Sequence, residues 1–227
     1  MRIACIVGSP RGNEGACGEI LRRMKPYFAR HELDEIEIQE GADLMDACFR
    51  VNDADGLVII SPLYFDGLPS EVLRFMEEME FRARHKGVPC ACVIACGYYE
   101  GEQAGIAVSM IENWCRRLSF HFTMGAGVGA AGVLQKYAEK DTSDKVFAGI
   151  GGVFAQIALS LASKERREDQ YFSLSVPRFL YKKAVEKSWR KMIRENGLSS
   201  RDLYACPVPE TENAVEEKTE TESETGE

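Results

Sequence analysis

The chain is short of the residues and spacings that mark metal-binding proteins. Among 227 residues there are only 3 His, and none of the 8 Cys belongs to a Cys-x-x-Cys pair. Structural metal sites need closely spaced ligand pairs. The one tight group, Cys90-x-Cys92-x3-Cys96, lies in an apolar run where cysteine acts as a small hydrophobe. We therefore expect no metal or iron–sulfur site.

Positive charge is also scarce. The 28 Lys and Arg are outnumbered by 36 Asp and Glu, for a formal charge of −8. Pro207 to Glu227 alone holds eight Glu and one Lys, so the rest of the chain is close to neutral. Nucleic-acid-binding domains are normally strongly basic, so we expect no nucleic-acid partner. The segment 207–227 is predicted to be a disordered acidic tail.

Long hydrophobic segments are missing as well. Before Gly8 the unbroken apolar run is only five residues long, Ile3 to Val7, too short for the core of a secretory signal. The uncharged run from Val146 to Ala162 reaches the lower limit of a membrane span but contains three Gly, one Gln and one Ser. We expect no membrane insertion, a buried helix in this run, and a cytoplasmic protein whose cysteines are reduced.

What the sequence does contain is an alternation of short apolar runs with amphipathic stretches of helical length, which is typical of βαβ units. Several runs are apolar on both alternating faces, as in parallel strands covered by helices on both sides. The pattern predicts an α/β fold: a flavodoxin-like three-layer sandwich with a five-stranded parallel sheet of order 2-1-3-4-5 and a C-terminal helical extension. The predicted strands are Arg2–Val7, Glu35–Ile38, Gly56–Ser61, Pro89–Cys96 and Ser119–Met124.

Helices are predicted between and after these strands. Pro26 should kink or cut the first of them. We divide the chain into a core at 1–124, a glycine-rich loop and helical extension at 125–206, packed on the core or in an oligomer interface, and the tail. The basic face of the last helix is interpreted as solvated. The predicted helices are Gly15–Arg30, Leu44–Asn52, Pro69–Arg84, Gln103–Leu118, Thr142–Ser163 and Pro177–Asn196.

The loop after the first strand has the properties of a phosphate site. It reads Gly8-Ser9-Pro10-Arg11-Gly12-Asn13-Glu14-Gly15-Ala16-Cys17 and leads into a helix. Glycines let the backbone fold around an anion, and a helix N-terminus directs free N–H groups towards it. Ser9 and Arg11 add donors. An ordinary strand-to-helix turn is the alternative.

Aromatic residues gather in the loops after the third and fourth strands. Tyr64 and Phe65 lie in the former, and Tyr98 and Tyr99 in the latter. In a 2-1-3-4-5 sheet these loops share an edge with the glycine-rich loop, near the point where strand order reverses. A phosphate site beside an aromatic wall suits flavin mononucleotide, FMN. The aromatics could also pack on the rim without any ligand.

Two segments carry a resemblance to a known family. Gly-Ser-Pro-Arg-Gly-Asn at 8–13 and Ser-Pro-Leu-Tyr-Phe-Asp-Gly-Leu-Pro-Ser at 61–70 resemble the NAD(P)H-dependent FMN reductases, a family of flavodoxin-like oxidoreductases. The resemblance covers about residues 1–124. It implies an FMN-containing enzyme that passes hydride from NADH or NADPH to flavin and on to a small acceptor such as a quinone or free flavin. It also implies a homodimer or homotetramer.

The resemblance further implies a set of cofactor-binding residues and no catalytic side chain, because the cofactor supplies the reactivity. The residues implied to hold the phosphate are Ser9, Arg11, Asn13, Gly15, Ala16 and Cys17. The residues implied to border the ribityl chain and ring are Pro62, Leu63, Tyr64, Phe65 and Gly67, with Gly97, Tyr98 and Tyr99 on the other side.

One departure from the family pattern favours a rival function. Members usually carry Ser or Thr hydroxyls where this chain has Ala16 and Cys17. Losing a hydrogen bond to a charged group costs about 1.5–3 kcal/mol. The rival is a non-catalytic flavodoxin-like interaction module with a degenerate FMN site.

Two other motifs compete with this interpretation. Cys5-x5-Arg11 has the spacing of a tyrosine-phosphatase signature, but Cys5 falls inside a strand, where burial favours the thiol. Gly127-x-Gly129-x-x-Gly132 matches a dinucleotide fingerprint, but no strong strand with an acidic end follows it. We interpret this second motif as a flexible or oligomer-packing loop.

Overall fold

The computed structural model describes residues 1–134 and 149–205. A parallel sheet runs through the first of its two compact units, Met1–Tyr181. Six strands lie in the order β2-β1-β3-β4-β5-β6. They are β1 (Arg2–Val7), β2 (Glu32–Glu37), β3 (Gly56–Pro62), β4 (Pro89–Ala95), β5 (His121–Gly129) and β6 (Gln170–Ser173).

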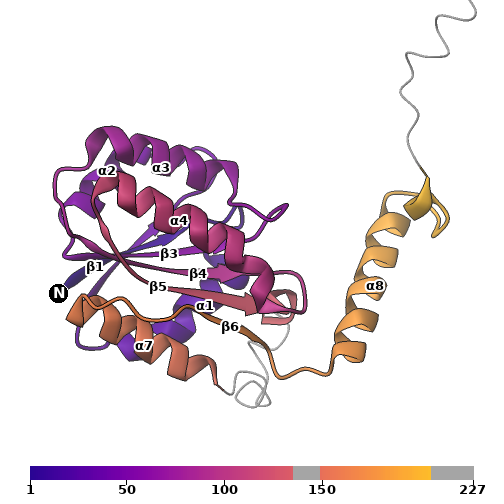
Figure 1. Ribbon diagram of the computed structural model, residues 1–227. Coiled ribbons are helices and arrows are strands. Elements are labelled where there is room, and N and C mark those ends of the chain that lie inside the picture. Colours follow the sequence, from indigo (N-terminus) through magenta and orange to yellow (C-terminus); the bar gives the residue numbers. More distant parts are fainter. Residues whose placement is uncertain (135–148, 206–227) are drawn as a thin grey trace, which may run out of the picture. The chain divides into compact units, whose positions relative to one another are not determined.

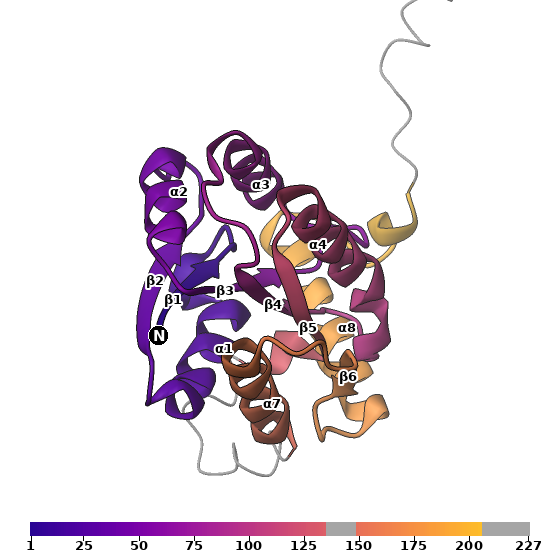
Figure 2. The ribbon, with the colours of Figure 1, turned by 60° about the vertical axis from the view of Figure 1, so that its left-hand side comes forward.

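Helices cover both faces of the sheet, which confirms the predicted three-layer α/β sandwich. Helices α2, α3 and α4 lie on one face, and α1 and α7 lie on the other (Figures 1 and 2). Central strands β3 and β4 are buried on both faces because each is sandwiched between these layers. The helices of this unit are α1 (Ala16–Met24), α2 (Leu44–Asn52), α3 (Ser70–Arg82), α4 (Gly105–Leu118) and α7 (Ile150–Ser163).

The helix boundaries follow local chemistry. Asp43 caps α2, because its Oδ1 accepts hydrogen bonds from the N–H groups of Met45 and Asp46. Helix α1 ends at Met24, and Pro26 lies in the short 3₁₀ helix η2 (Lys25–Phe28) that follows, as the proline predicted. The predicted start of the helix at Thr142 lies outside the described residues.

The strand predictions need two corrections at the sheet edges. Strand β2 begins at Glu32 rather than Glu35, because Glu32 is exposed and Leu33 and Asp34 are only partly buried, so that a single apolar residue marks the start of the strand. The prediction missed β6, which extends the 2-1-3-4-5 order to a sixth strand. Its four residues are only half-buried, and they pair in parallel with the end of β5.

A third correction concerns the glycine-rich stretch, which is the second half of β5 and not a loop. A Cβ on Gly127 would lie 2.4 Å from the backbone oxygen of Gly101, and a Cβ on Gly129 would lie 2.2 Å from that of Tyr99. Glycine is therefore required because the chain between β4 and α4 crosses this strand closely. The sheet extends beyond residue 124, where the predicted core ended.

The second compact unit begins at Lys182 and contains most of α8 (Arg178–Glu195). Its side chains are largely exposed, including those of Trp189 and Met192. A 3₁₀ helix, η5 (Asp202–Tyr204), follows. The predicted disordered tail lies outside the described residues. No helix in 1–134 or 149–205 is long and apolar enough to cross a membrane.

Candidate functional site at the switch point of the sheet

The strand order reverses between β1 and β3, because β2 lies on one side of β1 and the later strands lie on the other. Val7 pairs with Ile60, and Ile60 pairs with Val93, so β1, β3 and β4 end at one edge. In open parallel sheets, ligands bind beyond the carboxyl ends of strands at such a point. The predicted phosphate and aromatic loops therefore all emerge at the expected edge.

The loop after β1 is held in a defined shape by its own backbone. The N–H of Gly8 donates to the carbonyl of Ile60 over 2.8 Å, and the N–H of Gly12 donates to that of Ser9 over 2.8 Å. Ser9 is buried, and its Oγ accepts a hydrogen bond from the N–H of Arg11. Gly12 has a φ of +51°, which favours glycine. The turn is therefore preformed.

This loop ends at a helix N-terminus without a side-chain cap. Gly15 is the N-cap residue of α1 and provides no side-chain hydrogen bond, so the first-turn amides of Ala16 and Cys17 have no intrahelical partner. The exposed guanidinium of Arg11 makes no side-chain hydrogen bond or ion pair within the described part of the chain. Uncapped first-turn amides and a guanidinium without a partner in the described residues are the kinds of donor that anion sites use, so this loop is a candidate anion site.

Glu37 adds a negative charge that the sequence prediction missed. This residue ends β2, and its Oε1 accepts a hydrogen bond of 2.6 Å from Nδ2 of Asn13. A Cβ on Gly12 would lie 2.1 Å from its Oε2. The amide of Asn13, predicted to hold phosphate, is thus engaged by a carboxylate that would repel a phosphate bound nearby. In the sequence, Glu37 was marked only by its place inside the predicted strand Glu35–Ile38, which gave no reason to expect it beside the loop.

Cys17 lies in the first turn of α1 and is almost fully buried. Burial raises the pKa of its thiol to about 12, against a smaller opposing effect of a hydrogen bond with Ser9. The side chain is therefore a neutral thiol at physiological pH. It adds no charge to the anion site.

The loop after β3 forms a tight two-residue turn. Tyr64 and Gly67 bond to each other in both directions, with N···O distances of 3.0 and 2.9 Å. The ring of Tyr64 is 46% exposed and that of Phe65 is fully exposed. Leu63 is buried instead, and its N–H donates to Ala95. Pro62, Tyr64, Phe65 and Gly67 thus lie together at the surface of the site edge, whereas Leu63 belongs to the core.

The loop after β4 divides into an accessible and an engaged half. Gly97 is exposed, and Tyr98 is 56% exposed. Tyr99 turns to the C-terminal part of the same unit: its hydroxyl donates to the carbonyl of Val176 over 3.0 Å, and its ring lies 5.9 Å from that of Tyr181. Tyr98 is therefore the tyrosine of this pair that remains available to a ligand.

Tyr181 is a structural residue of this loop that the prediction missed. Its hydroxyl donates to the carbonyl of Gly97. Ser173 Oγ similarly donates to the carbonyl of Tyr99 over 2.6 Å. The end of β6, the first turn of α8 and the segment between them thus fix the loop after β4.

The competing motifs find no support in this geometry. Cys5 is fully buried in β1, where burial raises the pKa of its thiol to about 12, so it cannot serve as a phosphatase nucleophile. Gly127 and Gly129 face the chain before α4 rather than a ligand. In the described ranges, no group of three or more potential ligands could hold a metal ion.

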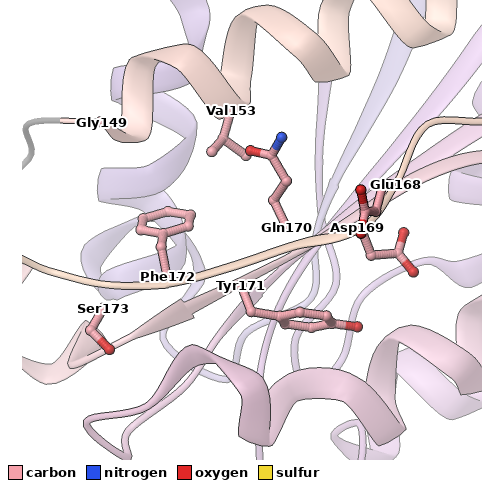
Figure 3. Close-up of a pocket in the computed structure, with 8 residues that line it drawn as sticks. All are labelled: Gly149, Val153, Glu168, Asp169, Gln170, Tyr171, Phe172 and Ser173. Carbon is pink, nitrogen blue, oxygen red and sulfur yellow. The ribbon is translucent and has the colours of Figure 1, made fainter.

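Two shallow clefts lie away from the predicted site residues. One, of about 490 Å³, is lined by β6 and the start of α7, with Gln170 reaching towards Val153 and Tyr171 on the opposite side of the strand (Figure 3). The other, of about 530 Å³, lies on the basic face of α8 around Lys187. Neither contains a residue from the loops after β1, β3 and β4.

Comparison with known proteins shows the fold. No protein-family model matches the chain, and no curated protein does. A solved flavodoxin of Streptococcus pneumonia matches with 17% identity and a TM-score of 0.51, covering 71% of this chain and 99% of that one. The NAD(P)H:(acceptor) oxidoreductase FerB of Paracoccus denitrificans gives 16% identity, 70% and 97% coverage and a TM-score of 0.48.

A third match is to a much longer chain. The flavodiiron core of Flv1 from Synechocystis shows 16% identity and a TM-score of 0.49, and the match covers 73% of this chain but 37% of that one. The strand order, the layers and the flavodoxin match agree. The chain has the flavodoxin-like α/β fold.

Proposed function

We propose that this protein is an FMN-dependent NAD(P)H oxidoreductase. The observation that carries the proposal is the candidate anion site after β1: an uncapped helix N-terminus beside the guanidinium of Arg11, which has no partner in residues 1–134 and 149–205, at the switch point of a flavodoxin-like sheet. Exposed aromatic rings of Tyr64 and Tyr98 border the same edge. This donor set fits a phosphate ester attached to a flat heterocycle.

The chain's own residues would bind and orient the cofactor. Amides of Gly15, Ala16 and Cys17, with Ser9 and Arg11, would hold the phosphate. The loops after β3 and β4 would border the ring. FMN, when bound, supplies hydride chemistry, so that NADH or NADPH and one proton are consumed for each quinone reduced to a hydroquinone. No side chain is required as acid or base for hydride transfer, and we assign no catalytic residue.

The proposal extends to the assembly and its location. A homodimer or homotetramer would cover the loops after β1, β3 and β4. A cytoplasmic location suits an interior in which all seven described cysteines are buried thiols. The physiological acceptor would be a small molecule such as a quinone or free flavin.

A second candidate function is a non-catalytic interaction module that has lost FMN. The carboxylate of Glu37 beside the anion loop favours it, as does the lack of hydroxyls at Ala16 and Cys17. Like charges near a bound phosphate weaken its binding.

An FMN titration followed by flavin fluorescence tests both functions. We expect micromolar binding, and bleaching of the flavin absorbance by NADH or NADPH without oxygen. Arg11→Ala should weaken FMN about 10- to 150-fold, the equivalent of a lost charged hydrogen bond. Lys187→Ala, on α8, is the matched control and should leave the affinity unchanged. Wild-type protein that binds no FMN would refute the oxidoreductase and support the interaction module, and equal effects of the two variants would refute the phosphate site.

A further inference from the structure

The turn after β3 places one residue in an unusual backbone conformation. Phe65 has a φ of +48° and Asp66 a φ of +60°, between the mutually bonded Tyr64 and Gly67. Two consecutive positive φ values define a type I′ turn. Such turns favour Asn, Asp or Gly at both central positions, because bulky side chains clash with the backbone at positive φ. Asp66 suits its place, and Phe65 does not.

Nothing within the described protein offsets this strain. The Phe65 side chain is fully exposed, so its ring gains nothing from burial. Two unfavourable features therefore coincide in one residue: a left-handed backbone and an apolar ring in water. A residue that combines a strained backbone with an exposed apolar ring is a candidate for ligand contact, because strained conformations cluster at ligand clamps.

The surroundings of Phe65 indicate which ligand it would contact. The turn follows the carboxyl end of β3, and the exposed side chains of Tyr98 and Ile106 come from segments at the same edge of the sheet. Tyr64, next to the strand, is about half exposed, whereas Phe65 occupies the tip of the turn. A ring at the tip, without intramolecular contacts, can lie flat on a planar molecule that arrives from solvent. Stacked aromatic pairs contribute attraction beyond their buried area.

We infer that Phe65 is a specificity-determining residue for the electron acceptor, and that its ring stacks on a planar aromatic acceptor such as a quinone. This inference rests on the proposed oxidoreductase function. It separates the tip of the turn, which selects the acceptor, from the anion loop, which holds the cofactor. The exposed ring is then a docking surface kept at the expense of fold stability.

The test compares Phe65→Asn with Phe81→Asn. Asn accepts a positive φ, so Phe65→Asn should raise the melting temperature by about 2–4 °C. It should also lower the ratio of kcat/KM for 1,4-naphthoquinone to that for ferricyanide about 3- to 10-fold, because ferricyanide has no ring to stack. Phe65→Tyr, which keeps the ring, should restore the ratio. Phe81 is 82% exposed at the end of α3. Its replacement by Asn should leave the acceptor ratio unchanged and should not raise the melting temperature.

Three results would overturn the inference. They are an unchanged acceptor ratio in Phe65→Asn, the same fall in Phe81→Asn, and no recovery in Phe65→Tyr. Wild-type protein without FMN or NAD(P)H-dependent activity would instead refute the proposed function, and the inference with it. Activity with an unaltered ratio in Phe65→Asn would refute the inference alone.

Discussion

The close crossing at β5 predicts a sharp difference between two Gly→Ala substitutions. A Cβ at Gly127 would lie 2.4 Å from the backbone oxygen of Gly101 and 2.6 Å from Cδ1 of Tyr171. The first contact is with backbone, so the chain before α4 must shift. Overpacking of this kind costs about 1–3 kcal/mol, which corresponds to a fall in melting temperature of about 2–12 °C for a chain of this size.

Gly152 is the matched control. It lies inside α7, where an added Cβ meets nothing within 4 Å. Replacing glycine by alanine within a helix stabilises by about 0.5–1 kcal/mol, so Gly152→Ala should raise the melting temperature by about 1–4 °C. Differential scanning calorimetry measures both variants directly.

Gly132 completes the experiment, because it is the third glycine of the dinucleotide-like motif. A Cβ there would meet only the hydroxyl of Tyr181, at an ordinary 3.7 Å. Gly132→Ala should therefore be tolerated, whereas a nucleotide-binding fingerprint would need this glycine for helix–strand packing. A Gly127→Ala protein that melts with the wild type would refute the packing explanation, and so would a Gly132→Ala protein destabilised as strongly as Gly127→Ala.

Three further predictions concern charges and thiols. Glu37→Gln keeps the hydrogen bond from Asn13 but removes the charge, so FMN should bind several-fold more tightly in a fluorescence titration; weaker binding would contradict the repulsion. In a Cys206→Ala protein, no thiol should react with Ellman's reagent at pH 8 until guanidinium is added, because the remaining cysteines are buried. Burial raises the pKa of Cys17 from 9.0 to about 12, so the free energy of unfolding should also fall as the pH rises from 9 to 12. The pKa of Asp34 is lowered, chiefly by its hydrogen bond from Arg50, so its contribution is present above its unfolded pKa of 3.8 and is lost in acid. Asp34→Asn should cost about 1–3 kcal/mol at pH 7 in urea unfolding, and the cost should shrink progressively as the pH is lowered below 3.8 and the carboxyl is protonated in the folded protein; a cost that does not change with acidification would contradict the ion pair.

Much of the fold was predictable because strong periodicity leaves few alternatives. Helix α2 begins and ends at the predicted Leu44 and Asn52, and β1 covers the predicted Arg2–Val7. Both segments carry continuous apolar patterns between clear polar boundaries. The order 2-1-3-4-5 came from the fold class rather than from any pattern in the strands, and the first five strands follow it.

The edges of the sheet were harder to predict because hydrophobic periodicity is weak there. Edge strands bury few side chains, so β2 begins before its main hydrophobic residues, and β6 offers only Tyr171 and Phe172 in a strand of four residues. The glycines of β5 were misinterpreted as a loop because their role depends on the backbone of Gly101 and Tyr99 crossing them. No pattern within the strand itself records that crossing.

By itself, the sequence determined the βαβ alternation, the burial of the central strands and the presence of a glycine-rich loop with Arg11 before a helix. These properties depend on neighbours a few residues apart along the chain. Only the tertiary structure decided that Glu37 engages Asn13, that Tyr99 is fixed by Val176 and Tyr181, and that Phe65 occupies a left-handed turn in solvent. Each of these depends on the path of the backbone or on contacts between distant segments, whose geometry arises only when the whole sheet has assembled.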